Sequence, residues 1–90
     1  MIIRRATMTE LGSLTELFDL YRVFYEQKSD LEGAQEFLKA RLVNEESIVF
    51  LAVEGSNPVG FVQLYPTFSS VSMKRSWVLN DLYVKEQYRG

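Results

Sequence analysis

Two adjacent polar residues, Asn80 and Asp81, interrupt the last apolar segment of the chain, which runs WVLNDLYV. The two-residue period of a strand places Asp81 on one face with Trp77 and Leu79, and Asn80 on the opposite face. A carboxylate buried there could accept a proton or bind a substrate. Alternatively, the strand has an exposed edge or a bulge, and the two polar side chains occupy it. The residues alone leave both interpretations open.

Two residue types are missing, since the 90 residues include no Cys and no His. This composition excludes disulfide scaffolds, cysteine nucleophiles, zinc sites built on Cys and His, and every catalytic triad with an imidazole base. Any chemistry must therefore use carboxylates, hydroxyls, lysines, backbone groups or a bound cofactor, and we expect no metal site.

The charge distribution narrows the classes of partner. The chain carries a net charge of −2 and no run of Lys or Arg, so we expect neither nucleic-acid binding through a basic patch nor a polybasic membrane anchor. The longest apolar run, residues 48–53, is far shorter than a membrane span, and the N-terminus MIIRRATMTE lacks the hydrophobic region of a signal peptide. We therefore expect a cytoplasmic protein in which residues 1–90 form one domain.

Two helices are predicted early in the chain, each opened by a capping box. Thr7 and Glu10 form the first box, and Ser29 and Glu32 form the second. Behind each box apolar side chains recur every three or four residues, as on one side of an amphipathic helix. The first stripe comprises Leu11, Leu14, Leu17, Phe18, Tyr21, Phe24 and Tyr25, and the second comprises Ala34, Phe37, Leu38 and Leu42.

Strands are predicted before and after the helices. Residues 2–6 form a short opening strand, and residues 48–53, a continuous β-branched and aromatic run, form a strand buried on both faces. A turn at residues 54–58 joins this strand to residues 59–65 in an antiparallel hairpin. Residues 66–70 are predicted as a loop and residues 72–84 as a long final strand. This order predicts an α+β fold with a mostly antiparallel sheet, whose helices cover at least one face.

The order of these elements, together with the segments PVGFVQLY, LNDLYV and the terminal YRG, resembles the first half of a GNAT-superfamily N-acetyltransferase. The pattern is most similar to the polyamine or diamine acetyltransferases, whose corresponding strand also carries an acidic and polar pair before an apolar pair and Val. The resemblance extends from Ile2 to Gly90 and includes the two-helix insertion after the first strand. It implies a GNAT-like fold that is cut off before the acetyl-CoA pyrophosphate loop and the helix after it.

The resemblance also implies where acetyl-CoA binds. The backbone groups of Leu82, Tyr83 and Val84 correspond to the strand end that hydrogen-bonds the acetyl carbonyl and the pantetheine arm. Arg89 and Gly90 match the first two positions of the family's Arg/Gln-x-x-Gly-x-Gly/Ala signature, whose backbone N–H groups hold the pyrophosphate. We expect the chain to be incomplete at its C-terminus, because the rest of that signature is missing.

The reaction that the resemblance implies is transfer of acetyl from a thioester to a small amine. Asp81 corresponds to the acidic position on the strand, with Asn80 beside it as a polar substrate contact, although the polyamine enzymes typically carry Glu at the Asn80 position. Tyr25, Glu26 and Asp30 lie between the two predicted helices, in a segment that often borders the acceptor site in this family. The competing interpretation makes Tyr25 part of the helix stripe and the two acids ordinary solvated residues.

A non-catalytic function is the alternative. A half-domain of this fold would expose apolar strand residues around Val78, Leu82 and Val84, together with an unpaired strand edge. Such surfaces associate by edge pairing or hydrophobic packing. The alternative therefore predicts a homodimer, or another association through the exposed sheet, in place of catalysis.

Overall fold

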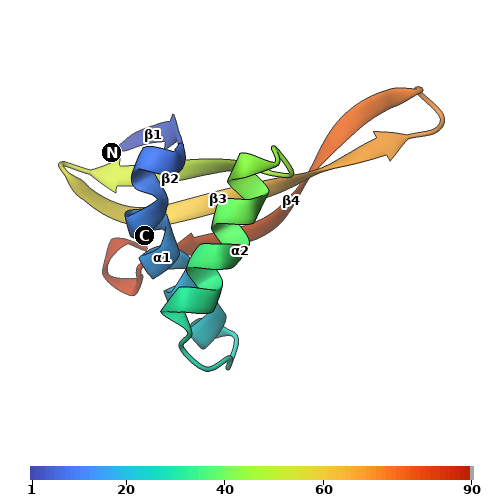
Figure 1. Cartoon of the computed structure of the whole chain (residues 1–90). Coiled ribbons are helices and arrows are strands. Elements are labelled where there is room, and N and C mark those ends of the chain that lie inside the picture. Colours follow the sequence, from blue (N-terminus) through green and yellow to red (C-terminus); the bar gives the residue numbers. More distant parts are fainter. Residues whose placement is uncertain (90) are drawn as a thin grey trace.

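The computed structural model describes residues 1–89 and has the element order that the sequence predicts (Figure 1). The sheet runs β1-β2-β3-β4 with every neighbouring pair antiparallel, so the α+β prediction is confirmed. No helix within residues 1–89 is long and apolar enough to cross a membrane. The elements are β1 (Ile2–Arg5), the 3-10 turn η1 (Met8–Glu10), α1 (Leu11–Phe24), α2 (Leu31–Val43), β2 (Ile48–Glu54), β3 (Asn57–Ser69), β4 (Lys74–Val84) and the 3-10 turn η2 (Glu86–Tyr88).

Both helices pack on the same face of the sheet (Figure 1), and the core lies between this helical layer and the sheet. The predicted helix stripes supply one side of this core, and alternate residues of β2 supply the other. Leu14, Leu38 and Leu51 are fully buried, with exposed fractions of 0%. The core side chains are Ala6, Leu11, Leu14, Leu17, Phe18, Ala34, Leu38, Val49, Leu51, Val53 and Phe61.

The opposite face of the sheet, which we call the open face, is not covered by any helix among residues 1–89. The prediction that β2 is buried on both faces is therefore wrong, because Ile48, Phe50 and Ala52 are only partly buried. Leu82 pairs with Val62 on this face and is 60% exposed. Residues 1–89 therefore leave the open face as an exposed apolar surface.

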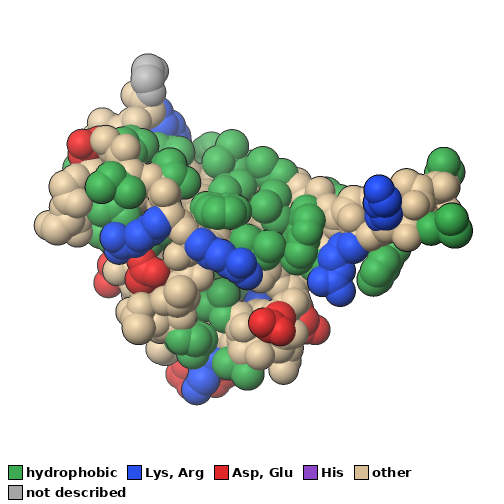
Figure 2. Space-filling model, turned by 90° about the horizontal axis from the view of Figure 1, so that it is seen from above, with side chains coloured by type: hydrophobic (Ala, Val, Ile, Leu, Met, Phe, Trp, Pro, Cys, Tyr) green, Lys and Arg blue, Asp and Glu red, His purple; other side chains and the backbone are tan. Residues whose placement is uncertain are grey.

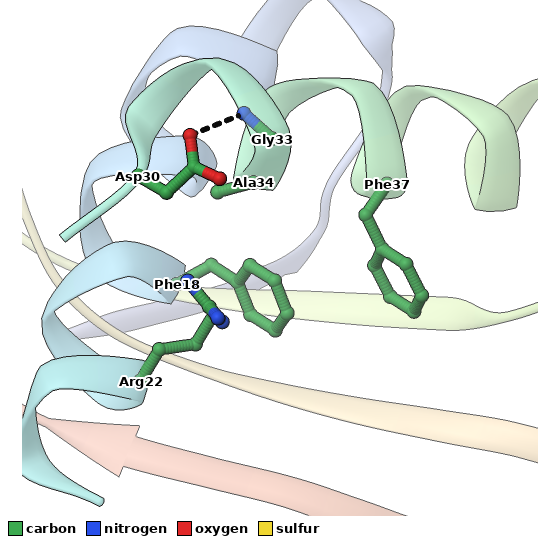
Figure 3. A pocket seen from close by; sticks show the side chains of 6 residues that line it. All are labelled: Phe18, Arg22, Asp30, Gly33, Ala34 and Phe37. Atoms are coloured by element: carbon green, nitrogen blue, oxygen red, sulfur yellow. Dashed lines mark hydrogen bonds between the residues drawn. The ribbon is translucent and has the colours of Figure 1, made fainter. Parts of the chain in front are cut away.

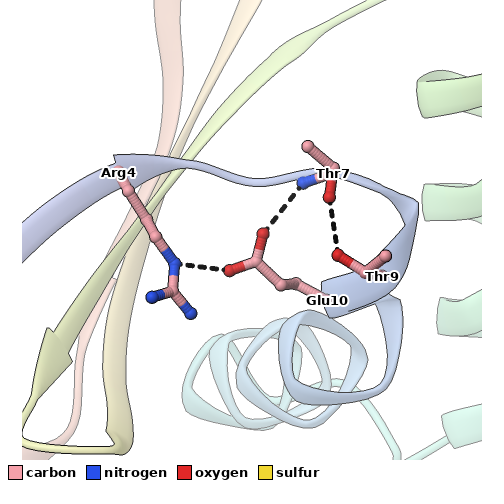
Figure 4. Close-up of polar contacts among 4 residues, drawn as sticks. All are labelled: Arg4, Thr7, Thr9 and Glu10. Atoms are coloured by element: carbon pink, nitrogen blue, oxygen red, sulfur yellow. Dashed lines mark hydrogen bonds and ion pairs between the residues drawn. The ribbon is translucent and has the colours of Figure 1, made fainter.

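The first capping box ties the start of the helical layer to β1. The backbone N–H of Thr7 donates to Glu10 Oε1 at 3.1 Å, as the box requires, and Arg4 Nε donates to Glu10 Oε2 at 2.6 Å (Figure 4). The hydrogen bond from Arg4 is the main cause that lowers the pKa of Glu10. The Thr7 hydroxyl lies 2.8 Å from that of Thr9. The Glu10 carboxylate thus links the first helical turn to β1.

The second helix begins one residue later than the second capping box predicts. Its N-cap is Asp30, whose Oδ1 accepts from the backbone N–H of Gly33 at 2.9 Å. The Ser29 hydroxyl instead donates to Asp19 Oδ2 at 2.6 Å, and the Asp30 N–H donates to Asp19 Oδ1 at 2.7 Å. Buried Asp19, in the middle of α1, therefore fastens the connection between the helices.

β3 continues beyond its predicted end. Residues 66–69 were expected to belong to a loop, but they pair with residues 74–77 of β4. β2 pairs no further along β3 than Leu64, so beyond that point β3 has a free edge, where a strand tolerates a proline such as Pro66. Residues 65–78 form a two-stranded ribbon, which we call the arm, that projects from the body (Figure 1).

We predict that Asp19→Ala destabilises the chain by about 2–3 kcal/mol, because it removes two charge-assisted hydrogen bonds in a buried position. The hydrogen bond from Ser29 holds the pKa of Asp19 below its ordinary value. This stabilisation is therefore present at neutral pH and is lost as the pH falls through the lowered pKa. Urea denaturation of the two proteins as a function of pH measures the effect.

The matched control is Glu16→Ala, which removes an exposed carboxylate from the same helix and should change stability by less than about 0.5 kcal/mol. Equal stability losses in the two variants, or a loss at Asp19 that persists in acid, would contradict the role assigned to this carboxylate.

Candidate functional site

A β-bulge displaces the strand register at the predicted site. Gln63 pairs with Asp81, whereas the next residue of β3, Leu64, pairs with Leu79, so Asn80 is the extra residue on β4. Paired residues share a face, and Asp81 therefore lies on the helix side with Gln63, while Leu79 lies on the open face. The prediction that Leu79 and Trp77 share the face of Asp81 is wrong, because the bulge interrupts the two-residue period.

The Asp81 carboxylate is buried, with an exposed fraction of 5%, and hydrogen-bonded from three elements of the chain. The Tyr21 hydroxyl of α1 donates to Oδ1 at 2.8 Å, and Gln63 Nε2 of β3 donates to Oδ2 at 2.8 Å. Asn80 Nδ2 donates to Oδ1 at 3.0 Å. Both predicted polar residues thus belong to one network, in which an exposed Asn80 lies beside a buried Asp81.

This network also affects two tyrosines. Burial, followed by the hydrogen bond to Asp81 and its negative charge, raises the pKa of Tyr21 to about 12. Burial and the Asp81 charge raise the pKa of Tyr65 to about 12 as well. Both phenols therefore stay protonated at neutral pH, and each can donate a hydrogen bond but cannot serve as a base.

β4 is the edge strand in residues 1–89, and its free backbone groups can be assigned. Lys85 N–H donates to Val59 O at 2.8 Å, so the preceding carbonyl, that of Val84, faces away from β3. Backbone direction alternates along a strand, so Leu82 also presents its N–H and C=O at the free edge and Tyr83 faces β3. The Tyr83 carbonyl indeed approaches Gly60 of β3 so closely that a Cβ there would lie 2.7 Å from it.

A hollow of about 260 Å³ adjoins this edge. Its walls come from the C-terminal end of α1 and the C-terminal end of β4, and the lining residues are Phe24, Tyr25, Leu82, Tyr83, Val84 and Arg89. The Arg89 guanidinium lies 5.2 Å from the Phe24 ring centre and 5.4 Å from that of Tyr83, and Nε donates to Val84 O at 2.6 Å. Arg89 thus occupies one of the free acceptors of β4.

The three predicted acceptor-site residues lie in different places. Tyr25 is 62% exposed and lines the hollow beside β4. Glu26 is exposed and adopts a left-handed backbone conformation, with φ of 65°, directly after α1. Asp30 caps α2 and lines a separate pocket between the two helices. Of the three, only Tyr25 is therefore brought to the hollow at the strand edge.

The pocket between the helices has a volume of about 300 Å³ (Figure 3). Its aromatic walls are the stacked rings of Phe18 and Phe37, 5.7 Å apart. Arg22 and Asp30 supply its charged groups, although Arg22 Nη1 donates to Lys28 O at 3.3 Å and Asp30 is engaged at the helix N-terminus. Phe18 also packs against Tyr21 and Phe61, so this pocket and the Asp81 network share an aromatic wall.

Two partners of Asp81 were missed by sequence reasoning. Gln63 is the one polar side chain in the predicted strand 59–65 apart from Tyr65, and this position could have signalled a buried polar contact. The structure shows that Gln63 is fully buried. Its Oε1 has no hydrogen-bond partner in the described chain. Tyr21 was assigned to the helix stripe, and nothing in the stripe distinguishes a tyrosine that packs from one that also donates a hydrogen bond. Gly90, the other expected contact of the pyrophosphate, lies outside the described residues.

Comparison with known proteins identifies the family. The family model described as the acetyltransferase (GNAT) family matches residues 14–90. The chain is 56% identical over 84 residues to the Bacillus subtilis (strain 168) protein named "Uncharacterized N-acetyltransferase YhfO", covering 93% of the chain and 56% of that protein. It is 37% identical over 87 residues to a "Probable acetyltransferase" of Haemophilus influenzae, covering 96% of the chain and 60% of that protein.

A solved structure shows the same arrangement. A crystal structure of a probable acetyltransferase superimposes with a TM-score of 0.94 at 46% identity, and covers 99% of this chain and 60% of the other. The chain therefore spans somewhat more than half of the length of these relatives. The match of family model, relatives and fold leads to one assignment: the chain belongs to the GNAT family of acetyltransferases.

Proposed function

We propose that this chain forms the part of an N-acetyltransferase that holds the acetyl group and receives a small amine. The observation that carries the proposal is the meeting of three features at one end of β4. They are the free backbone groups of Leu82 and Val84, the hollow beside them, and the buried carboxylate of Asp81 at the adjoining bulge.

The strand edge suits the pantetheine arm of acetyl-CoA, the acetyl donor of the GNAT family. An extended amide chain can pair with an unpaired strand as another strand would, using alternate N–H and C=O groups. Leu82 and Val84 supply such groups, whereas Tyr83 contributes its ring to the wall of the hollow. When the pantetheine arm hydrogen-bonds to the Val84 carbonyl, Arg89 gives up its own hydrogen bond to that oxygen. Its guanidinium is then free to pair with a phosphate.

Acetyl-CoA supplies a thioester whose carbonyl carbon forms the new C–N bond with the amine while the C–S bond breaks. A cationic amine must lose two protons in this exchange. We assign acceptance of the first, which frees the nitrogen lone pair, to Asp81, directly or through ordered water entering beside Asn80, and the second balances the departing thiolate, which is released as the free thiol. The hydrogen bonds from Tyr21 and Gln63 fix the carboxylate at the bulge. Asn80, exposed on the same bulge, is proposed to contact the amine substrate.

The acceptor is proposed to be a cationic amine that approaches along the aromatic wall of the hollow. Tyr25 and Phe24 are exposed there, and aromatic faces attract ammonium groups. Glu26 follows Tyr25 and can add a negative charge at the entrance. Asp30 is the weakest of the proposed contacts, since its carboxylate caps α2. Polyamines and diamines are one candidate class within this proposal.

The test is an assay of thiol release from acetyl-CoA in the presence of a panel of amines. Since the chain spans 56% of its Bacillus subtilis relative, the assay uses the chain joined to the part of that protein that it does not cover. We expect thiol release that depends on the amine and falls by roughly 10²–10⁴-fold in Asp81→Ala, as for the loss of a general base.

Glu86→Ala, an exposed carboxylate just beyond β4, is the matched control and should retain activity. Thiol release that needs no amine would identify a thioesterase, and equal rates in Asp81→Ala and the control would remove Asp81 from the reaction.

A second prediction concerns the network alone and needs no substrate. Asp81→Asn should lower the pKa of Tyr21 from about 12, because the negative charge and the charge-assisted hydrogen bond are removed. The pKa should remain above 10.0, since burial is the larger cause. The stabilisation by Tyr21 is complete below pH 10.0 and is lost as the pH rises toward about 12. The ¹³Cζ shift of the tyrosine ring, followed by NMR, reports the titration.

Glu26→Gln removes an exposed charge from the segment after α1 and serves as the control, with the Tyr21 titration unchanged. If Tyr21 titrates identically in wild type and Asp81→Asn, the hydrogen bond between them is not present in solution.

The second candidate function is a non-catalytic half-domain that associates through the open face. The observation in its favour is the exposure of Ile3, Leu79 and Leu82 on that face, at 62%, 55% and 60%. A dimer that dissociates in the double variant Ile3→Ser/Leu82→Ser, in a protein without acetyl transfer, would support this function. A dimer unaffected by these changes would refute it.

A further inference from the structure

The arm carries an apolar tip that nothing in the described chain covers. Val71 and Met73, in the turn that joins β3 to β4, are 97% and 88% exposed, and Phe68, near the end of β3, is 74% exposed. Beyond Leu64 the ribbon has β2 on neither edge, and its residues extend from the body by about 15 Å, at roughly 3.3 Å per residue. A protruding ribbon of this kind is costly to leave in water, since large exposed apolar groups mark contact surfaces.

The arm is also basic. Its residues, 65–78, include two basic ones, Lys74 and Arg75, and no acidic one. Arg75 lies over the rings of Phe68 and Trp77, at 5.6 and 5.8 Å from their centres. Neither Lys74 nor Arg75 forms an ion pair within residues 1–89. Figure 2 shows the basic and hydrophobic side chains along the projecting arm.

The helical layer has the complementary charge. Residues 8–47 contain nine acidic side chains and four basic ones, a net charge of −5. At its junction with the arm lies a hollow of about 510 Å³, lined by Arg41, Glu45, Glu46, Tyr65, Pro66 and Arg75. Glu46 pairs with Arg41 at 3.0 Å, whereas Glu45 is exposed and has no ion pair within residues 1–89. The hollow at the root of the arm thus offers an aromatic ring, a proline and the exposed Glu45, beside the Arg41–Glu46 pair and Arg75.

We propose that two copies of this chain exchange arms. The tip of each arm seats in the hollow at the root of the other, with Val71 and Met73 against Tyr65 and Pro66. Lys74 of each copy faces Glu45 of the other. The two arms then lie side by side and antiparallel about a twofold axis, which makes the contact self-complementary. The charge complementarity of the basic arm and the acidic helical layer selects a second copy as the occupant. Tyr65 and Pro66 offer the tip an apolar contact within a hollow that is otherwise lined by charged side chains.

The exchange places the association on a surface different from the open face of the sheet. It leaves the free edge at Leu82 and Val84 and the hollow beside it uncovered, because those lie at the opposite end of β4 from Lys74. The proposal therefore stands independently of the acetyl-transfer function, and an active monomer would refute it without affecting that function.

Sedimentation velocity over a range of concentrations tests the exchange. Wild type is expected to dimerise, and Val71→Ser/Met73→Ser should raise the dimer Kd by at least about tenfold, equivalent to roughly 1.4 kcal/mol. These residues are exposed at a turn, so the variant should keep the fold, as circular dichroism will verify. Ile3→Ser/Leu82→Ser, which removes comparable apolar groups from the open face, is the control and should leave the Kd unchanged.

Charge reversal tests the pairing of tip and root. Lys74→Glu and Glu45→Lys should each weaken self-association, because both contacts of either homodimer then pair like charges. An equimolar mixture of the two should form heterodimers with affinity close to that of wild type, because each of its two contacts again pairs a lysine with a glutamate. A wild type that stays monomeric at millimolar concentration would overturn the proposal. So would a dimer lost only in the open-face control, or a mixture that fails to recover any affinity relative to the single variants.

Discussion

The structure depends on the burial of one carboxylate, that of Asp81. A buried ionised group costs several kcal/mol unless donors surround it. The donors come from α1, β3 and the neighbouring position of β4, through Tyr21, Gln63 and Asn80. Satisfying Asp81 therefore requires that the helix, the inner strand and the edge strand take up fixed positions relative to one another. The bulge lies at the same place, since Asn80 is the residue inserted opposite β3.

The bulge has a second consequence for the edge of the sheet. It sets which residues of β4 face the helices and which backbone groups remain free at the strand end. Asp81 and Tyr83 face the helical layer, whereas Leu82 faces the open side. The main-chain groups of Leu82 and Val84 point away from β3, and those of Tyr83 point toward it. A buried carboxylate and an unpaired strand edge thus come to lie within a few residues of each other, and the proposed acyl transfer rests on this arrangement.

Much of the fold could be predicted from the sequence, because the helices and strands have strong periodic patterns. The apolar stripe from Leu11 to Tyr21 predicted the first helix, and the apolar run at residues 48–53 predicted β2. The order of elements, together with short motifs such as LNDLYV, indicated the family. The extension of β3 through Pro66 was missed because proline is a turn residue in most contexts and only the absence of β2 beyond Leu64 makes it tolerable. The shift of the second helix cap was missed because Asp19, distant in sequence, competes for Ser29.

The candidate site was predictable in part. Asn80 and Asp81 were conspicuous because polar residues are rare in such a strand, but their partners were not. A hydrogen bond between Tyr21 and Asp81 joins residues that are 60 positions apart, and local patterns carry no information about it. Backbone direction at Leu82, Tyr83 and Val84 likewise depends on the register of β4 against β3, which the bulge alters.

Hydrogen–deuterium exchange, measured by NMR residue by residue, tests the central claim most directly. The amides of Leu82 and Val84 should exchange rapidly in the free chain, while that of Tyr83, directed at β3, should be protected. Saturating acetyl-CoA should then slow exchange at Leu82 and Val84 and leave Tyr83 nearly unchanged. Protection of Leu82 and Val84 before any ligand is added, or acetyl-CoA-dependent protection confined to other parts of the chain, would contradict the account.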